Sequence, residues 1–426
     1  MSGLTEPVKP PMEPVKISPA RMAAFEVLHR VEETSAHSDD VLYGPALAKL
    51  SQQDKNLATA LVLGVLRWEI ALDARLARLF ARPEEIPALP ILIALRLGAF
   101  QLLHMDRIPA HAALSESVEL VRWAGQPQAA GMVNAVLRKL TREPAPRRPL
   151  VESTAAMATR LGHPAWLVER WVKHFGRPAA EAICGYDQSE PAQGNLFASA
   201  EGLPHLDDGS RLVAELTAAS MENPQRIWDA CAAPGGKTMV LAQRHPGSSF
   251  LATDANPKRL RAMESRLKRE MPEAKIRLVE ADAARLPAGE GDFDLILCDV
   301  PCSGTGTLSR NPEIRNRLRA TDLELQAKRQ REILSAALAR LAPGGRLVYS
   351  TCSLEPEENE AVLAEILART KEVGMVPVET LFSSLDKAAV TNTERLDALV
   401  RDGYLRTLPG VGFKGDGFFA AVLTRD

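Results

Sequence analysis

The sequence contains little cysteine and no long apolar run. Five cysteines in 426 residues, none in a Cys-x-x-Cys pair, argue against a disulfide scaffold or a structural zinc site, so we expect no metal. The longest uncharged apolar stretch, Ile86 to Leu95, is far shorter than the ~20 residues that span a bilayer. The first 20 residues hold five prolines and do not resemble a signal peptide. We therefore expect a cytoplasmic protein with reduced thiols.

The chain also has no excess of one charge. Its 52 basic and 54 acidic residues give a net charge of −2, which excludes a histone-like protein but permits a local nucleic-acid-binding patch. Basic residues cluster at 138–148 and at 310–319. A solvated face is the usual meaning of such a cluster, and a strip of phosphate contacts is the alternative.

Periodicity divides the chain into four parts. Residues 1–17 are proline-rich, which is typical of a disordered tail. Residues 18–140 show helical periodicity from Ser18-Pro19 onward and predict an all-helical domain. Residues 141–225 begin with three prolines in ten residues, which predicts a stiff linker, and continue with a short helical connector at 164–175.

From 226 to 426, short apolar runs alternate with helical segments. Strands are expected at 226–230, 249–254, 276–281, 293–300, 346–352 and 418–423, with helices starting near 238, 257, 322 and 357. This alternation predicts an α/β domain with a doubly wound parallel sheet.

The turn after the first expected strand reads DACAAPGGKT, residues 229–238. Gly235 and Gly236 permit a close approach to the backbone, at the place where open sheets bind nucleotide-like ligands. A P-loop would need glycine where Cys231 stands, and a dinucleotide site would need Gly-x-Gly-x-x-Gly. S-adenosylmethionine needs no phosphate cradle, so it is the expected cofactor.

Acidic residues end or follow the next three strands. Asp254 is placed to accept hydrogen bonds from ribose hydroxyls, or to cap the helix at Pro257. Asp282 is placed to reach an adenine amino group, or is an ordinary loop residue. Asp299 ends the fourth strand.

Cys302 and Cys352 lie just past the fourth and fifth strands, and Cys184 and Cys298 are expected to be buried thiols. Because neighbouring parallel strands end at the same edge, the first two should meet beside the cofactor. Two thiols beside a methyl donor indicate methylation of cytosine, since a thiolate on carbon 6 makes carbon 5 nucleophilic. Asp299 is placed to hydrogen-bond N3 and N4 of the cytosine ring while the adduct forms. Strand position alone does not decide which cysteine attacks carbon 6 and which one helps.

The segments DACAAPGGKT, DVPCSGTG and YSTCSLEPEENE resemble those of the RNA cytosine-5 methyltransferases of the Sun family. FEVLHRVEE, LVLGVLRW and MVNAVLRKL resemble the NusB-like domain of its bacterial small-subunit rRNA member. The resemblance covers residues 18–426 and implies a Rossmann-like class I methyltransferase sheet acting on RNA, with Cys352 as nucleophile and Cys302 as the helper that resolves the adduct. The cofactor contacts that it implies are Cys231, Ala232, Ala233, Pro234, Gly235, Gly236, Lys237, Asp254, Asp282 and Asp299.

One departure from the family concerns its RNA-binding subdomain, which usually opens with Arg-x-Asn. Here only residues 194–211 fill that place and the arginine is missing, so we expect a shortened subdomain. The expected substrate is 16S ribosomal RNA and the expected state is a monomer. The alternatives are an enzyme acting on tRNA or another RNA, a small-molecule or DNA methyltransferase, and a non-catalytic RNA-binding assembly factor.

Overall fold

The computed structural model describes residues 17–34, 36–42, 44–82, 86–144, 151–191, 194–197, 204–286, 289–385, 390 and 396–426. The chain divides into two compact units, residues 1–163 and 164–426. All but the last residue of the expected tail at 1–17 lies outside the described residues. Within the described ranges, none of the helices combines the length and apolar character that a membrane span requires.

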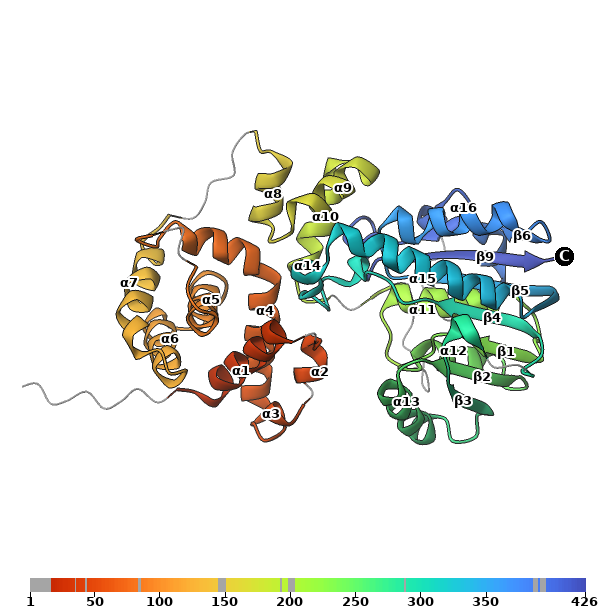
Figure 1. The fold of residues 1–426 in the computed structure, drawn as a ribbon, viewed down its shortest axis with the longest axis horizontal. Helices are drawn as coiled ribbons and strands as arrows, with labels where there is room; N and C mark the ends of the chain where they lie inside the picture. The colour runs from red at the N-terminus through yellow and green to blue at the C-terminus, as the bar shows by residue number, and fades with distance from the viewer. Residues whose placement is uncertain are drawn as a thin grey trace, which may run out of the picture. The chain divides into compact units, whose positions relative to one another are not determined.

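The first unit is helical throughout its described residues (Figure 1, red to yellow). The first helix begins as expected, with Ser18 before it and Pro19 as its first residue. A later helix begins after Ser51, whose hydroxyl accepts a hydrogen bond from the N–H of Asp54. The elements are α1 (Pro19–Glu33), α2 (Ser38–Leu42), α3 (Pro45–Ala48), α4 (Gln52–Ala77), α5 (Leu89–His104), α6 (Ala110–Trp123), η1 (Pro127–Ala129), α7 (Ala130–Leu140) and α8 (Thr154–Arg160).

The core of this unit depends on a close contact between α4 and α5. A Cβ atom added to Gly64 would lie 2.0 Å from the ring of Phe100, so only glycine fits at this point of α4. Nearby, the buried Arg96 pairs with Asp73 at 2.7 Å and with Glu32 at 2.9 Å. These contacts join α1, α4 and α5 into one packed body.

The second unit begins with helices that the sequence only partly predicted. The expected connector at 164–175 is α9 (Ala165–Phe175), and α10 (Arg177–Asp187) and α11 (Asp208–Ala219) follow it. The described residues between α10 and α11 form neither a helix nor a named strand. The region predicted as linker and connector, residues 141–225, is therefore divided between the two units: α8 belongs to the first unit, and α9 to α11 belong to the second.

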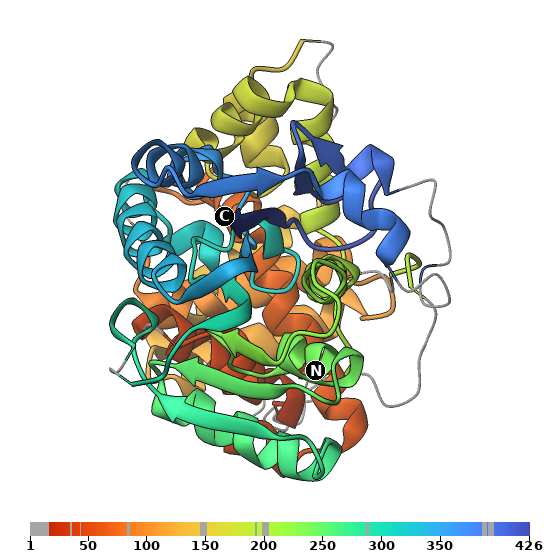
Figure 2. The same cartoon turned by 90° about the vertical axis from the view of Figure 1, so that its right-hand side faces the viewer.

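The sheet of the second unit confirms the doubly wound parallel prediction. Its strand order is β3-β2-β1-β4-β5-β9-β8-β7, and β6 also pairs with β9. The first five are parallel neighbours, whereas β9 runs antiparallel to β5 (Figure 2, in which the C-terminal end of the chain is marked). The strands are β1 (Arg226–Asp229), β2 (Ser249–Asp254), β3 (Ile276–Glu280), β4 (Phe293–Asp299), β5 (Leu341–Thr351), β6 (Val373–Val376), β7 (Val400–Arg401), β8 (Tyr404–Arg406) and β9 (Phe419–Arg425).

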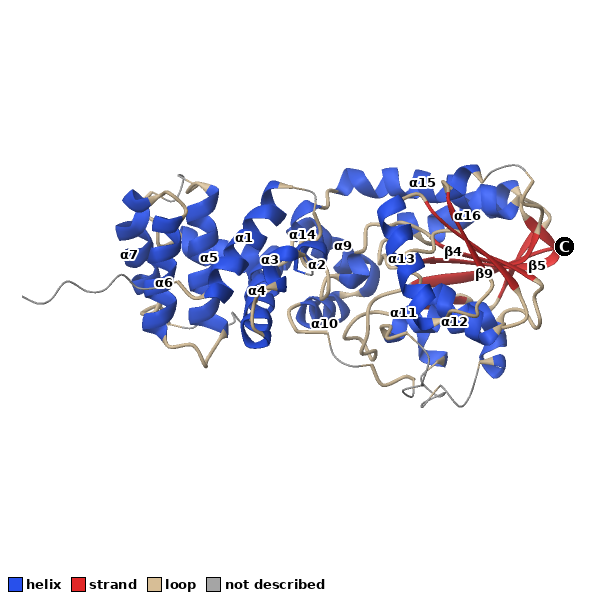
Figure 3. Cartoon of the chain, turned by 90° about the horizontal axis from the view of Figure 1, so that it is seen from below, coloured by secondary structure: helices blue, strands red, loops and turns tan. Residues whose placement is uncertain are grey.

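Helices cover both faces of this sheet. Side chains alternate along each strand, so Ile227 packs with Leu212 and Leu241 on one face while Trp228 packs with Leu334 on the other. Figure 3 shows the strands between these two helical layers. The remaining helices are α12 (Gly236–Arg244), α13 (Pro257–Glu270), η2 (Ala283–Arg285), η3 (Thr305–Thr307), α14 (Ile314–Arg317), α15 (Ala320–Leu338), η4 (Pro356–Glu358), α16 (Glu360–Arg369), η5 (Val378–Ser384) and η7 (Asp397–Leu399).

Two features of the sheet differ from the prediction. Strand β5 begins at Leu341 instead of 346, because Leu341 already pairs with Phe293. The register then shifts, so residues 342–345 bulge out before Arg346 pairs with Leu295. The short strands β6, β7 and β8 were not predicted, since two to four residues are too few to show a periodicity.

Candidate active site

The turn between β1 and α12 is shaped by its glycine. Gly235 has a φ of +96°, and a Cβ atom there would also lie 2.9 Å from the side chain of Met263. The turn is closed by a hydrogen bond from the N–H of Gly235 to the carbonyl of Ala232, at 2.7 Å. At its base, the Thr238 hydroxyl donates to the buried Asp229 at 2.6 Å. The turn is therefore tightly packed, with Gly235 required both by its positive φ and by the contact with Met263.

Asp254 is buried at the end of β2 and joins two segments. Its carboxylate accepts hydrogen bonds from the N–H of Ala233 at 3.2 Å and of Asn256 at 2.8 Å. The cap of α13 is Asn256, whose side chain accepts from the N–H groups of Lys258 and Arg259. The capping alternative for Asp254 is therefore wrong, and its carboxylate faces the β1 turn instead.

Asp282 follows β3 and accepts a hydrogen bond from the N–H of Ala284 at 2.9 Å. It also pairs with Arg329 of α15, a partner that sequence reasoning missed. Burial acts to raise the pKa of Asp282, but the hydrogen bond and charge of Arg329 outweigh it and hold the pKa below its usual value. An ionised carboxylate at the end of β3 suits a hydrogen bond from an amino group.

Asp299 ends β4 and has a basic partner. The Lys237 ammonium lies 2.7 Å from one carboxylate oxygen, and the Ser350 hydroxyl donates to the other at 2.8 Å. Burial acts to lower the pKa of Lys237, yet the Asp299 carboxylate raises it above its usual value. The side chain of Lys237 thus contacts Asp299, so it is held toward the thiol side of the site.

Cys302 and Cys352 meet as the strand order predicts. Their Sγ atoms are 3.3 Å apart, which is a contact between free thiols, since a disulfide bond is ~2.05 Å long. Both side chains are half-buried, whereas Cys184 and Cys298 are fully buried as expected. The two half-buried thiols lie at the carboxyl ends of β4 and β5, beside Asp299 and Lys237.

The thiol loops are held by contacts that the sequence did not reveal. The N–H of Gly306 donates to the carbonyl of Cys352 at 2.9 Å, and its own carbonyl accepts from the N–H of Gly417 at 2.7 Å. In α9, Arg170 and Trp171 both donate to the buried Glu355, at 2.7 and 3.0 Å. Gly306 and Glu355 stand near predicted site residues in the sequence, whereas Arg170, Trp171 and Gly417 do not, so chain spacing offered no signal for these three partners.

Two arginines of the basic cluster at 310–319 make structural contacts that neither of the sequence alternatives included. Arg310 pairs with Asp207 at 3.0 Å and with Asp416 at 2.8 Å. Arg315 is buried and donates to two backbone carbonyls, those of Asp187 and Leu308. These two arginines therefore join segments of the second unit. In the other cluster, Arg138, Lys139 and Arg142 are exposed, and the residues at 145–150 lie outside the described residues.

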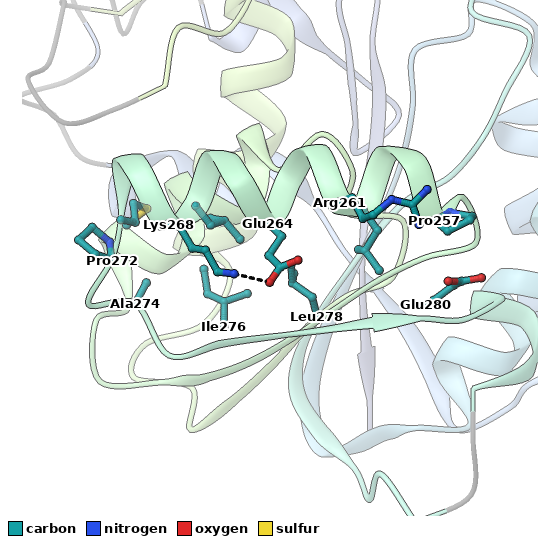
Figure 4. Close-up of a pocket in the computed structure, with 12 residues that line it drawn as sticks. Pro257, Arg261, Glu264, Lys268, Pro272, Ala274, Ile276, Leu278 and Glu280 are labelled. Atoms are coloured by element: carbon teal, nitrogen blue, oxygen red, sulfur yellow. Dashed lines mark hydrogen bonds and ion pairs between the residues drawn. The ribbon is translucent and has the colours of Figure 1, made fainter.

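A surface hollow of about 400 Å³ lies between α13 and β3 (Figure 4). It shares no lining residue with the predicted site. Glu264 and Lys268, one turn apart on α13, form an ion pair on its helical side at 2.6 Å. The candidate site is therefore the strand-end cluster and not this hollow.

Two family models match the chain. The model described as 16S rRNA methyltransferase RsmB/F matches residues 216–424, and the NusB family model matches residues 18–142. The first match contains the sheet with the site described above. The second lies within the helical unit.

Curated relatives match nearly the whole chain. Ribosomal RNA small subunit methyltransferase B of Klebsiella pneumoniae is 31% identical over 95% of this chain and 98% of the relative. The protein of the same name from Salmonella paratyphi C is 33% identical over the same shares, 95% and 98%.

Solved structures support the fold. The crystal structure of PH0851 has a TM-score of 0.71 at 21% identity, covering 97% of this chain and 100% of that chain. A methyltransferase homolog protein from Pyrococcus horikoshii has a TM-score of 0.50 at 24% identity, covering 65% and 100%. At these identities the likeness concerns the fold alone. The sequence matches go further, and by them the chain belongs to the RsmB/F family of 16S rRNA methyltransferases.

Proposed function

We propose that the protein transfers a methyl group from S-adenosylmethionine to carbon 5 of a cytosine in 16S ribosomal RNA. Family membership supports the reaction class, and the names of the curated relatives support ribosomal RNA as the substrate. The observation that carries the proposal is the pair of thiols, 3.3 Å apart, beside an aspartate and a lysine at the strand ends. A small-molecule methyltransferase would not need this pair.

The residues around the β1 turn fit S-adenosylmethionine, which supplies an electrophilic methyl group when bound. Gly235 keeps the turn free of a side chain, and the carboxylates of Asp254 and Asp282 are acceptors for ribose hydroxyls and an adenine amino group. We assign the other contacts to the turn residues Cys231, Ala232, Ala233, Pro234, Gly236 and Lys237 and to Asp299.

Cys352 is proposed as the nucleophile. Its thiolate adds to carbon 6 of the cytosine, and the electron pair of the carbon 5–carbon 6 double bond makes carbon 5 nucleophilic. Asp299 hydrogen-bonds N3 and N4 of the ring, while Lys237 and Ser350 fix the orientation of its carboxylate. After methyl transfer, Cys302 takes part in removing the carbon 5 proton, the double bond reforms, and the Cys352 thiolate leaves carbon 6.

The two thiols can be separated by experiment. Cys352→Ala should abolish methylation and form no covalent complex. Cys302→Ala should still attack and transfer methyl, and should then stall as a protein–RNA adduct visible as a slow band on a denaturing gel. The Cys302→Ala/Cys352→Ala double variant is the control without a band. Turnover retained in Cys352→Ala, with no band in any variant, would refute covalent catalysis.

The substrate requires a separate measurement. Bisulfite sequencing of total RNA from cells with and without the gene should show one or more protected cytosines in 16S ribosomal RNA that depend on the gene. Dependent positions in tRNA alone would assign the protein to that RNA instead.

We further propose that the protein acts in the cytoplasm as a monomer. A reducing compartment suits two thiols 3.3 Å apart that must stay unbridged for catalysis. All of the predicted site residues belong to the second unit of one chain, so a partner copy is not needed to complete the site. Light scattering of the purified protein measures its mass and would reveal a dimer.

A further inference from the structure

A buried glutamate joins the two loops that carry the thiols. Glu358 ends η4, and its carboxylate accepts the N–H of Ser303 at 2.8 Å and also the hydroxyl of Ser303. It accepts the hydroxyl of Ser353 at 2.5 Å. Ser303 directly follows Cys302, and Ser353 directly follows Cys352. The Glu358 carboxylate therefore accepts hydrogen bonds from the residue that follows each of the two cysteines.

The glutamate is itself held from two further elements. Gln330 of α15 donates to its carboxylate at 3.0 Å and to the carbonyl of Pro301 at 3.0 Å. The Tyr349 hydroxyl of β5 donates to the backbone carbonyl of Glu358 at 2.5 Å. Glu358 therefore has little freedom to move, and the loops attached to it share its position.

The hydrogen bonds around Glu358 match an ionised carboxylate. Each of its side-chain partners donates a proton, and an ionised carboxylate only accepts. Burial raises the pKa of Glu358, and the donors from Ser303, Ser353 and Gln330 act against this rise.

Among the described residues, the titratable groups that interact with Cys302 include Cys352, Glu358 and Tyr349. The ion pair of Lys237 and Asp299 lies beside the thiol pair, with Lys237 acting on Cys352. The hydrogen bond with Cys352 contributes most to raising the pKa of the Cys302 thiol well above its usual range. Burial and then the negative charges of Cys352 and Glu358 add to the effect. Tyr349 is neutral near pH 7, because burial raises its pKa above the usual value. Glu358 is therefore a carboxylate whose charge acts on Cys302.

We propose that Glu358 is a positioning residue that keeps the proton on Cys302 in the free enzyme, so that Cys352 is the thiol that attacks. Once the Cys352 sulfur is bonded to carbon 6 it no longer carries a negative charge, so Cys302 releases its proton to solvent and can take the carbon 5 proton after methyl transfer. This inference rests on the function proposed above and adds the reason why two adjacent thiols have different roles. The hydrogen bonds of Glu358 set the spacing of the thiols, and its charge opposes a second negative charge at Cys302.

Thiol alkylation tests the inference without RNA. The reaction of Cys302 with iodoacetamide is followed against pH by peptide mass spectrometry in Cys352→Ala and in Cys352→Ala/Glu358→Gln. The pH at which the alkylation rate of Cys302 is half its maximum, its midpoint, should fall by roughly one unit when Glu358→Gln removes the carboxylate charge. In a Cys302→Ala background, the midpoint for Cys352 should move less. An unchanged Cys302 midpoint would overturn the proposal.

Two variants control for a general loss of structure. Glu357 is the neighbouring carboxylate, but it is more exposed and pairs with Arg170, so Glu357→Gln should leave the Cys302 midpoint where it is. Glu358→Asp keeps the charge, so it should retain the high midpoint while methylation slows. If Glu358→Gln does not fold, Glu358→Asp decides the question, because a fallen midpoint in that variant would contradict a charge effect.

The methylation kinetics complete the test. Glu358→Gln should lower kcat with little change in the KM for S-adenosylmethionine, since the acidic residues at the cofactor turn are untouched. A failure of the Glu358 proposal can be told apart from a failure of the proposed function. A chain that forms no covalent adduct would refute the thiol mechanism, whereas the alkylation midpoints report on Glu358 alone.

Discussion

Gly306 is the point at which the Cys302 loop, the Cys352 loop and the C-terminal segment meet, and it should not tolerate a side chain. A Cβ atom built at this residue would lie 2.2 Å from the carbonyl oxygen of Gly417 and 2.8 Å from its Cα and carbonyl carbon. All three atoms belong to the backbone, so no side-chain rotation can relieve the overlap. In Gly306→Ala one of the two segments must therefore move.

The size of the effect follows from this geometry. Adding one methyl group to a packed site costs about 1–3 kcal/mol when the surroundings must shift, which corresponds to roughly 2–10 °C in Tm for a unit of this size. The loss of rate should be larger, because a displacement of ~1 Å between reacting groups lowers the rate by about 100-fold. We expect a moderately destabilised enzyme with a strongly reduced kcat and an almost unchanged affinity for S-adenosylmethionine.

Thermal unfolding and single-turnover methylation of Gly306→Ala test this expectation. The matched control is Gly185→Ala in α10, where a Cβ atom would have nothing within 4 Å. This control should raise stability by about 0.4–1 kcal/mol and leave the rate unchanged. Wild-type stability and rate in Gly306→Ala would show that the close approach to Gly417 does not hold the thiols in place.

Three further predictions concern the cofactor, pH and RNA. Asp254→Ala should weaken S-adenosylmethionine binding roughly 10–100-fold in titration calorimetry, through loss of hydrogen bonds of ~1.5–3 kcal/mol, and equal affinity would exclude a cofactor contact. Burial raises the pKa of Asp229 to about 7 from 3.8. The protonated carboxyl therefore contributes its whole share of the folding free energy below about pH 4, and this share is lost as the pH rises through 7. Relative to Asp229→Asn, the wild type should therefore lose up to about 4 kcal/mol between these pH values in urea unfolding, and parallel curves would contradict the shift. Replacing the exposed Arg138 and Arg142 with Gln should weaken RNA binding and reduce its salt slope by about 1 per lost phosphate contact, as measured by fluorescence anisotropy; an unchanged slope would indicate a solvated face.

The sequence by itself determined the architecture of both units and the meeting of Cys302 and Cys352. Capping and apolar spacing located α1 with its first residue, since both are local properties of the chain. Short apolar runs located β1 to β5, and the rule that parallel strands end at one edge brought Cys302 and Cys352 together. These inferences held because each depends on spacing within a short segment.

The tertiary structure decided which groups surround the site residues. Lys237 lies in the cofactor turn by sequence, but its ammonium contacts Asp299, 62 residues further along the chain. Arg329 and Glu358 likewise reach Asp282 and the thiol loops through contacts between separate elements.

The arginines at 310 and 315 illustrate the same limit. Sequence reasoning treated them as a solvated face or as phosphate contacts, whereas the fold uses them to join distant carboxylates and carbonyls. A charge pattern along the chain does not show which residues lie opposite it. Hydrogen bonds and ion pairs between residues far apart in sequence depend on how the elements pack, and no local pattern encodes that packing.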